Sequence, residues 1–574
     1  MALRTLYQTL LDSDFIRLRV IAEQWQIALT AERKADAAAE LADALARADA
    51  VERALAALPE SSREALHDLL RRGGAVPWAI FIREWGDLRP VGPGRLEREA
   101  LWRAPASPTE DLWYRGFIQK AFEERASGQV AMVFVPEELR LYLPPPPPLT
   151  IPAPEPVAEP LHCRPGDAAL AEDLVTLWAA LQVAAVGAAP LAWRDEALAQ
   201  FAAPAAPRLT FLETLALEQG WLRREEDAGL RLAPEPVLTW LQADPWVQWE
   251  RLMQAWIDSD TWNDLANIPA LRPDPVKGWP AVSREVRCAL LDGLRHYTSG
   301  GWYPIAAFVT RMRAYATDFL RPDGDYDAWA LRDAATDKPL RGFEAWDAVE
   351  GVLIAFVLTG PLTWLGLVDL GGASAEWPLT VFRLNAAGAA LLGLTPAPTF
   401  PPAPPLKIQP DGLFVVPEGR RYERFQLSRV AQRVGRVAGE SPGWTYRLTP
   451  ASLSRARQQH ISLERIFSFL AQATGQPVPP SLRAAIEAAY TGVAQARLER
   501  VWLLRVTDAA LLDSPNVRPY VREFLGPGLA TIHESDYERV VALLTRSGVL
   551  PDWVGEPGNQ KVEISYQKSV MRNE

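Results

Sequence analysis

The sequence predicts a multi-domain protein that is mainly α-helical, with winged-helix modules (α+β) and a C-terminal α/β domain. Three observations lead to this fold class. The chain has 574 residues, whereas one domain usually holds roughly 100–200. Two proline-rich segments, at 144–160 and 395–405, divide it. Before the second of these segments, a pattern of amphipathic helices followed by two short apolar runs recurs about three times, which indicates a repeated helical module closed by a β-hairpin.

The proline-rich segments set the predicted domain boundaries. Proline at this density favours an extended spacer. The predicted parts are an N-terminal helical region with a winged-helix-like module (1–143), a linker (144–160), a second module with further helices (161–275), a third module (276–394), a second linker (395–405) and a C-terminal α/β domain (406–574). The first linker is either a passive spacer or a docking site for an SH3-like partner.

Within the first module, Ser61 and Glu64 have the spacing of a capping box, which predicts a helix that ends at Gly73. The other elements expected there are helices over 77–85 and 109–124 and a strand over 130–135. The second module is predicted as a helix over 209–219, closed by Gly220, and a hairpin over 221–233. The third is predicted as helices over 284–297, 303–316 and 343–360 and strands over 363–371 and 379–385.

The C-terminal block mixes apolar runs of strand length with helical patterns. Strands are expected over 413–417, 445–448 and 529–534, and one long strand or a strand pair over 496–508. Helices are expected over 422–435, 451–459, 462–475, 520–526 and 535–548. The 22 tryptophans of the chain lie mostly among apolar residues, which predicts core packing for them.

Charge and composition indicate a cytoplasmic protein without a membrane partner. The N-terminus is interrupted by charged residues and does not resemble a signal peptide. The run 349–367 is broken by Gly360 and Pro361, so we expect a buried helix followed by a strand there. The two cysteines are far apart, as expected in a reducing compartment. The net charge is −11, yet residues 406–574 hold 22 basic against 17 acidic side chains.

Motifs of catalysis are missing from the sequence. It has no G-x-x-x-x-G-K-[ST] loop for a nucleotide-driven motor, no G-x-G-x-x-G, G-x-S-x-G or H-E-x-x-H motif, and no paired C-x-x-C. We therefore expect no enzymatic activity, no cofactor and no metal. The adjacent His162 and Cys163 are a weak candidate for metal binding.

Two acidic groups offer alternatives to this expectation. The run with Asp323, Asp325 and Asp327 starts like a calcium loop but lacks its later glycine and glutamate, which favours a solvated loop. The second group consists of Asp258, Asp260 and Asp264. These carboxylates either perform acid–base chemistry in a hydrolase or cap a helix and form a turn.

A basic segment over 420–465 carries the strongest binding signal. It holds ten arginines against Glu423, Glu440 and Glu464. The predicted helix over 422–435 would point Arg429, Arg433 and Arg436 outward at i, i+4, i+7 spacing. Arginines so placed suit phosphate contacts, or a solvated face that pairs with the acidic N-terminal blocks. The candidate nucleic-acid-binding residues are Arg420, Arg421, Arg424, Arg429, Arg433, Arg436, Arg447, Arg455 and Arg457.

The predicted winged-helix modules carry charges of the opposite sign. The third helix of the first module contains four acidic residues against Arg115 and Lys120. The hairpin of the second module contains Glu225, Glu226 and Asp227. Because a major groove repels acidic side chains, these modules suit protein partners at least as well as DNA.

Residues 445–490 resemble a bacterial family of helicase-associated proteins named after the N-terminal-like domain of the XPB helicase. The likeness is carried by Tyr446-Arg447-Leu448-Thr449, Ser452-Leu453, Phe467 to Leu470, Gln476-Pro477-Val478-Pro479 and Leu482. The segments 92–118, 363–371 and 382–393 are similar to this family as well. The resemblance implies a protein associated with DNA transactions; the ATPase motor that accompanies this domain in XPB is missing from the sequence, so no unwinding activity is expected.

Two functions follow as hypotheses. The first is a non-catalytic DNA-binding or helicase-associated accessory protein, whose C-terminal basic surface contacts DNA and whose partner is a protein such as a helicase or nuclease subunit. The alternative is a protein-interaction scaffold built of winged-helix modules that does not bind DNA directly.

Overall fold

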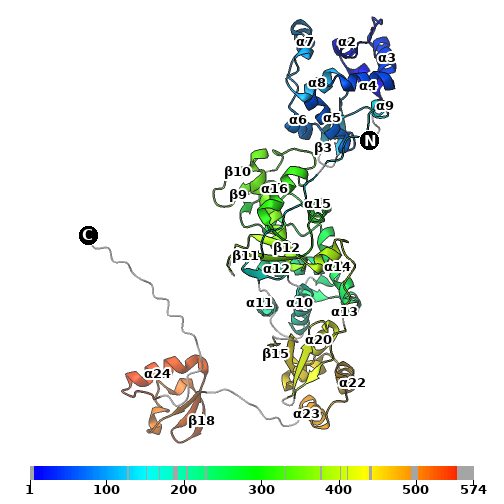
Figure 1. Cartoon of the computed structure of the whole chain (residues 1–574). Helices are drawn as coiled ribbons and strands as arrows, with labels where there is room; N and C mark the ends of the chain where they lie inside the picture. Colours follow the sequence, from blue (N-terminus) through cyan, green and yellow to red (C-terminus); the bar gives the residue numbers. More distant parts are fainter. Residues whose placement is uncertain are drawn as a thin grey trace, which may run out of the picture. The chain divides into compact units, whose positions relative to one another are not determined.

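The computed structural model shows a mixed α/β protein that divides into two compact units, residues 1–490 and 491–574 (Figure 1). It describes residues 5–552 except 126–127, 150, 167–168, 185–191, 202–204, 226–228, 330, 375–377, 401, 410–411, 438–441 and 493–501. The range 406–574, predicted as one α/β domain, is shared between the two units.

The N-terminal part of the first unit is a helical region with one small antiparallel sheet. Its elements are α1 (Leu6–Asp12), α2 (Phe15–Gln24), α3 (Lys34–Leu45), α4 (Ala48–Ala56), α5 (Glu60–Arg71), β1 (Ala75–Pro77), α6 (Trp78–Trp85), α7 (Pro93–Glu99), α8 (Pro108–Tyr114), β2 (Gln119–Arg125), β3 (Gly128–Phe134) and α9 (Glu137–Arg140). The strand order is β1-β3-β2, so the first strand pairs with the second strand of the hairpin. Leu66, Phe81, Leu112 and Val133 join α5, α6, α8 and this sheet in one core.

Two predictions in this region are wrong. Helix α8 ends at Tyr114, and residues expected to continue it form strand β2. Gly116 has φ +76 and lies against Ile21, which turns the chain out of the helix. In β2, exposed and less exposed side chains then alternate, as on a half-buried strand. The Ser61–Glu64 capping box does not form either, because α5 begins at Glu60, before Ser61.

The central part of the first unit, over 161–394, has one continuous hydrophobic core. Its helices are α10 (Leu170–Ala184), α11 (Ala192–Ala199), α12 (Ala206–Glu218), α13 (Pro234–Leu241), α14 (Pro245–Asp258), α15 (Arg284–Leu294), α16 (Ile305–Tyr315), α17 (Val352–Thr359), α18 (Pro361–Trp364) and α19 (Ala386–Leu391). Its strands are β4 (His162–Arg164), β5 (Leu222–Glu225), β6 (Gly229–Leu232), β7 (Leu271–Arg272), β8 (Trp302–Pro304), β9 (Leu331–Asp333), β10 (Pro339–Leu340), β11 (Val368–Gly372) and β12 (Val381–Leu384). Trp178, Trp221 and Trp240 pack edge to face at its centre, which confirms core packing for these tryptophans.

The arrangement of the N-terminal module recurs in this part. Helix α15, strand β8, helices α16 and α17 and the hairpin β11–β12 follow in the same order, and β8 again pairs with the hairpin's second strand. Strand β4 adds an outer strand beside β11. The helix with the apolar length of a membrane span within the described residues covers Phe343–Trp364, and 67% of its most apolar window is buried inside the protein. The expected buried helix is confirmed by α17. The strand expected after it is present as β11, but it begins at Val368 and not at Thr363, because Pro361–Trp364 form the short helix α18.

The last part of the first unit, over 406–490, is a four-stranded antiparallel sheet followed by helices. Its elements are β13 (Lys407–Ile408), β14 (Leu413–Pro417), α20 (Arg421–Ser428), β15 (Gln432–Val437), β16 (Gly443–Arg447), α21 (Pro450–Gln458), α22 (Leu463–Thr474) and α23 (Pro480–Thr491). The strand order is β13-β14-β16-β15. The predicted helix over 422–435 is wrong in its second half, because 432–437 form β15, where Val434 and Val437 favour extended backbone.

The second unit has a three-stranded antiparallel sheet and one longer helix. Its elements are β17 (Trp502–Arg505), β18 (Val521–Gly526), β19 (Leu529–Ile532) and α24 (Tyr537–Arg546), with the strand order β17-β19-β18. The predicted helix over 520–526 is wrong, because this segment is β18 and forms a hairpin with β19. Gly528, with φ +69, makes the turn between them.

Candidate nucleic-acid interface

The nine candidate arginines lie on four elements or at their ends: α20, β15, β16 and α21. They do not form one outward helical face. Arg429 follows the end of α20, while Arg433 and Arg436 belong to strand β15. The predicted i, i+4, i+7 row is therefore wrong, and each arginine has its own surroundings.

Arg421 and Arg424 hold α20 against α10. Arg424 is 1% exposed and its Nη1 donates to the Glu172 carboxylate at 2.7 Å and to the Glu172 carbonyl at 3.1 Å. Its guanidinium also lies over the Trp444 ring, 3.8 Å from the centroid. The Arg421 Nε is 2.8 Å from the other Glu172 oxygen. These two arginines neutralise a buried carboxylate of the central part, so they are structural in this arrangement.

Arg420, Arg433 and Arg436 also contact protein groups. Arg420 donates to the Ala403 carbonyl at 3.0 Å and to Glu423 at 2.9 Å. Arg433 donates to the Gln200 side chain. Burial lowers the pKa of the Arg433 guanidinium, and the neighbouring Arg424 and Arg436 lower it further. Arg436 is exposed and pairs with Glu418 at 2.7 Å.

Three further arginines lie nearer to solvent. Arg447 ends β16 and is exposed. Arg457, on α21, is exposed and donates to the Tyr490 carbonyl at 3.4 Å. Arg455 is half-buried and donates to the Ala431 carbonyl at 3.5 Å. Because a carbonyl does not neutralise the positive charge of a guanidinium, Arg457 remains suited to a phosphate.

Arg429 lines a cleft between α20 and α22 with a volume of about 310 Å³. Arg465 lines the same cleft, and the two guanidinium groups are close enough that Arg465 lowers the pKa of Arg429, although burial is the larger cause. The sequence marks Arg465 as part of the basic run, but only the packing of α22 on α20 places it opposite Arg429. Gln459, which sequence reasoning missed, also lines the cleft.

The acidic groups singled out in the sequence have structural partners. Asp264 is fully buried and accepts from Arg287 Nε at 3.0 Å and from the Trp262 indole at 2.8 Å. Asp258 is exposed and pairs with Arg284. One carboxylate is thus buried and paired while the other faces solvent, so the two are not arranged for joint acid–base work.

The possible metal ligands are dispersed in the same way. Asp325 accepts from the backbone N–H groups of Asp327 and Ala328, and Asp323 pairs with Arg125 at 2.6 Å. His162 and Cys163 lie on the exposed strand β4. In the part of the chain that the structure describes, no three His, Cys, Asp or Glu residues are grouped as metal ligands.

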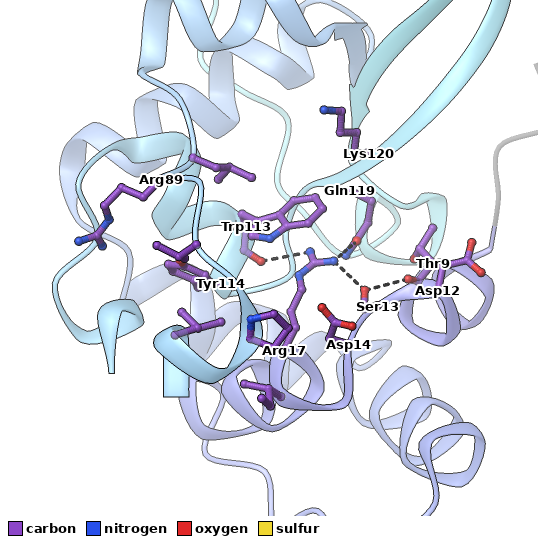
Figure 2. Close-up of a pocket in the computed structure, with 15 residues that line it drawn as sticks. Thr9, Asp12, Ser13, Asp14, Arg17, Arg89, Trp113, Tyr114, Gln119 and Lys120 are labelled. Atoms are coloured by element: carbon purple, nitrogen blue, oxygen red, sulfur yellow. Dashed lines mark hydrogen bonds between the residues drawn. The ribbon is translucent and has the colours of Figure 1, made fainter. Parts of the chain in front are cut away.

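A second cleft, of about 350 Å³, lies in the N-terminal region (Figure 2). Arg17 lies at its centre, stacked on the Trp113 ring, and donates to Ser13 Oγ at 2.8 Å and to Gln119 Oε1 at 3.0 Å. Burial lowers the pKa of Arg17 to about 9, against a smaller opposing effect of Asp14. Because its acceptors are neutral groups at the end of α1, on α8 and on β2, this guanidinium connects α2 to these three elements.

Residues 406–527 match the family model described as "Helicase conserved C-terminal domain". This range covers all nine candidate arginines and the two helices that line the cleft, α20 and α22. It also extends into the second unit. The match supports a helicase-related protein with a helicase-associated role. A comparison with curated proteins finds no match.

Proposed function

We propose that this chain is a non-catalytic, helicase-associated accessory protein that binds DNA through the basic surface of residues 406–490. The observation that carries the proposal is the helicase C-terminal match over the segment that holds the arginines. Arg447 and Arg457 supply the exposed positive charge, and Arg429 and Arg465 line a cleft beside it. Phosphate contacts by such arginines give affinity without sequence preference.

The proposal extends to the modules, the family subtype and the cellular setting of this protein. The recurring helix–strand–helix–helix–hairpin modules are winged helices, the family subtype is the XPB N-terminal-like one, and the protein acts in the cytoplasm beside a helicase or nuclease subunit that supplies the motor. The sequence lacks the phosphate-binding loop that a motor needs to hold its nucleotide, which supports a motor located on a separate subunit.

One observation favours the alternative, a protein-interaction scaffold, for the modules themselves. In the third module the helix in the DNA-reading position would be α17, whose Leu353, Ile354 and Val357 are buried in the core. In the first module it would be α8, whose Glu110 is buried against Arg89. Neither helix offers a groove-reading surface, so within the proposal these modules bind protein and the 406–490 region binds DNA.

Salt dependence of binding tests the proposal. We expect Arg447→Ala with Arg457→Ala to weaken binding of labelled DNA in fluorescence anisotropy. The slope of log affinity against log salt should fall by about 0.7–0.9 for each phosphate that the double variant no longer neutralises. Arg53→Ala is the matched control, because Arg53 is exposed on α4 and pairs only with Asp49 in its own helix. Equal slopes for the wild type and the double variant would assign DNA binding to another surface. If the wild type does not bind DNA even at low salt, DNA binding is rejected and the protein-interaction scaffold is the remaining hypothesis.

A further inference from the structure

The cleft between α20 and α22 combines positive charge with the absence of a counter-charge. Among the described residues, none of those lining it is acidic, and no carboxylate lies within ion-pair distance of Arg429 or Arg465. By contrast, the half-buried Arg421, on the same helix α20, has an acidic partner in Glu172. Two facing cations without a partner destabilise each other, and an anion between them would remove that repulsion.

Hydrogen-bond donors in the cleft are also unmatched. Arg429 Nη1 donates to Gln426 Oε1 at 3.2 Å, but its Nε and the Gln459 Nε2 are buried without an acceptor. Buried donors in folded proteins are nearly always paired. The oxygens of a bound phosphate would supply acceptors that the protein does not.

The other side chains that line the cleft indicate which chemical group is attached to that phosphate. The rings of Tyr422 and Phe469 and the amides of Gln426 and Gln472 line the same space. Aromatic rings stack on nucleobases, and side-chain amides can bond to base edges. A cleft of about 310 Å³ is at the lower end of small-ligand pockets. It therefore suits one unstacked nucleotide, whereas the bases of a duplex are stacked inside the helix.

We propose that this cleft binds one nucleotide of a single-stranded nucleic acid. The phosphate lies between Arg429 and Arg465, with Gln459 as a further donor, and the base lies against Tyr422 and Phe469. The inference rests on the proposed function and specifies it further: the 406–490 region holds an open strand at a defined point, as a helicase-associated protein would need to do beside a separated duplex.

Arg465→Ala is the variant that tests the cleft. Arg465 is exposed and its guanidinium has no described ion pair, so its removal leaves the packing of α22 intact. With a labelled oligo-dT strand and the full chain, we expect about a tenfold loss of affinity and a salt slope lower by about 0.7. Arg465→Lys keeps the charge and is expected to retain the slope. Arg483→Ala is the control, because Arg483 is exposed on α23 and pairs with Glu487 at 3.0 Å.

The outcomes separate the cleft from the proposed function. If the wild type binds oligo-dT and Arg465→Ala binds equally well, the cleft assignment is overturned while the proposed function stands. If the wild type binds neither oligo-dT nor duplex, both are overturned. If a duplex, or an acidic peptide of equal charge, competes as well as unlabelled oligo-dT, the cleft recognises negative charge alone and the single-strand assignment is wrong.

Discussion

At the scale of single residues, arginine serves two different purposes within one basic run. Arg424 is buried and neutralises Glu172, whereas Arg447 is exposed at the end of a strand. The sequence locates all of these arginines but not their purposes, because Glu172 lies 252 residues before Arg424. A hydrogen bond over that separation depends on tertiary packing, which local charge patterns do not contain.

Removal of Arg424 should destabilise the protein strongly. Arg424→Ala leaves the Glu172 carboxylate, which belongs to α10, buried with one cation fewer, and breaking a buried ion pair typically costs about 3–5 kcal/mol. Arg436→Ala is the control, because Arg436 also contacts the Trp444 ring but pairs with Glu418 at the surface. There we expect a loss of about 1 kcal/mol or less. Urea denaturation followed by circular dichroism measures both; equal losses would show that the Arg424 pair does not hold α20 to α10.

At the scale of elements, sequence periodicity identifies the long helices and the strands flanked by clear turns. Helices α12, α15 and α22 and strand β14 lie where the patterns place them. The errors share a cause. Strands β2, β15 and β18 each have charged side chains at spacings that a helix would also accommodate, and only pairing with the next strand selects the extended form.

The pairing of β14 with β16 gives an element-scale prediction. A Cβ at Gly443 would lie 2.3 Å from the Val416 carbonyl oxygen, whereas one at Gly435, on β15 of the same sheet, would meet Thr445 Oγ1 at an ordinary 3.6 Å. We expect Gly443→Ala to lower the free energy of unfolding by about 1–3 kcal/mol and Gly435→Ala to change it by less than about 0.5 kcal/mol. Chemical denaturation tests the pair, and the opposite order would contradict the strand register.

At the scale of the whole molecule, the sequence predicts the mixed α/β, multi-part architecture, but the parts interact more than their linkers indicate. The core of the central part includes Phe425 of α20, so the 406–490 region packs against it across the second proline-rich segment. The cleft between Arg429 and Arg465 could not be predicted from the sequence, because it depends on how α22 packs on α20. The missing motor motifs, in contrast, are read directly from the sequence.

The central proposal is that this helicase-associated chain binds DNA without a motor of its own. Its most direct test is an anisotropy titration of the unmodified 574-residue chain with single-stranded DNA, at several salt concentrations, with and without ATP and Mg²⁺. Phosphate release is measured in the same samples. The account predicts affinity that falls steeply with salt, the same affinity with and without ATP, and phosphate release at background level. No binding at low salt, or DNA-stimulated ATP hydrolysis, would contradict it.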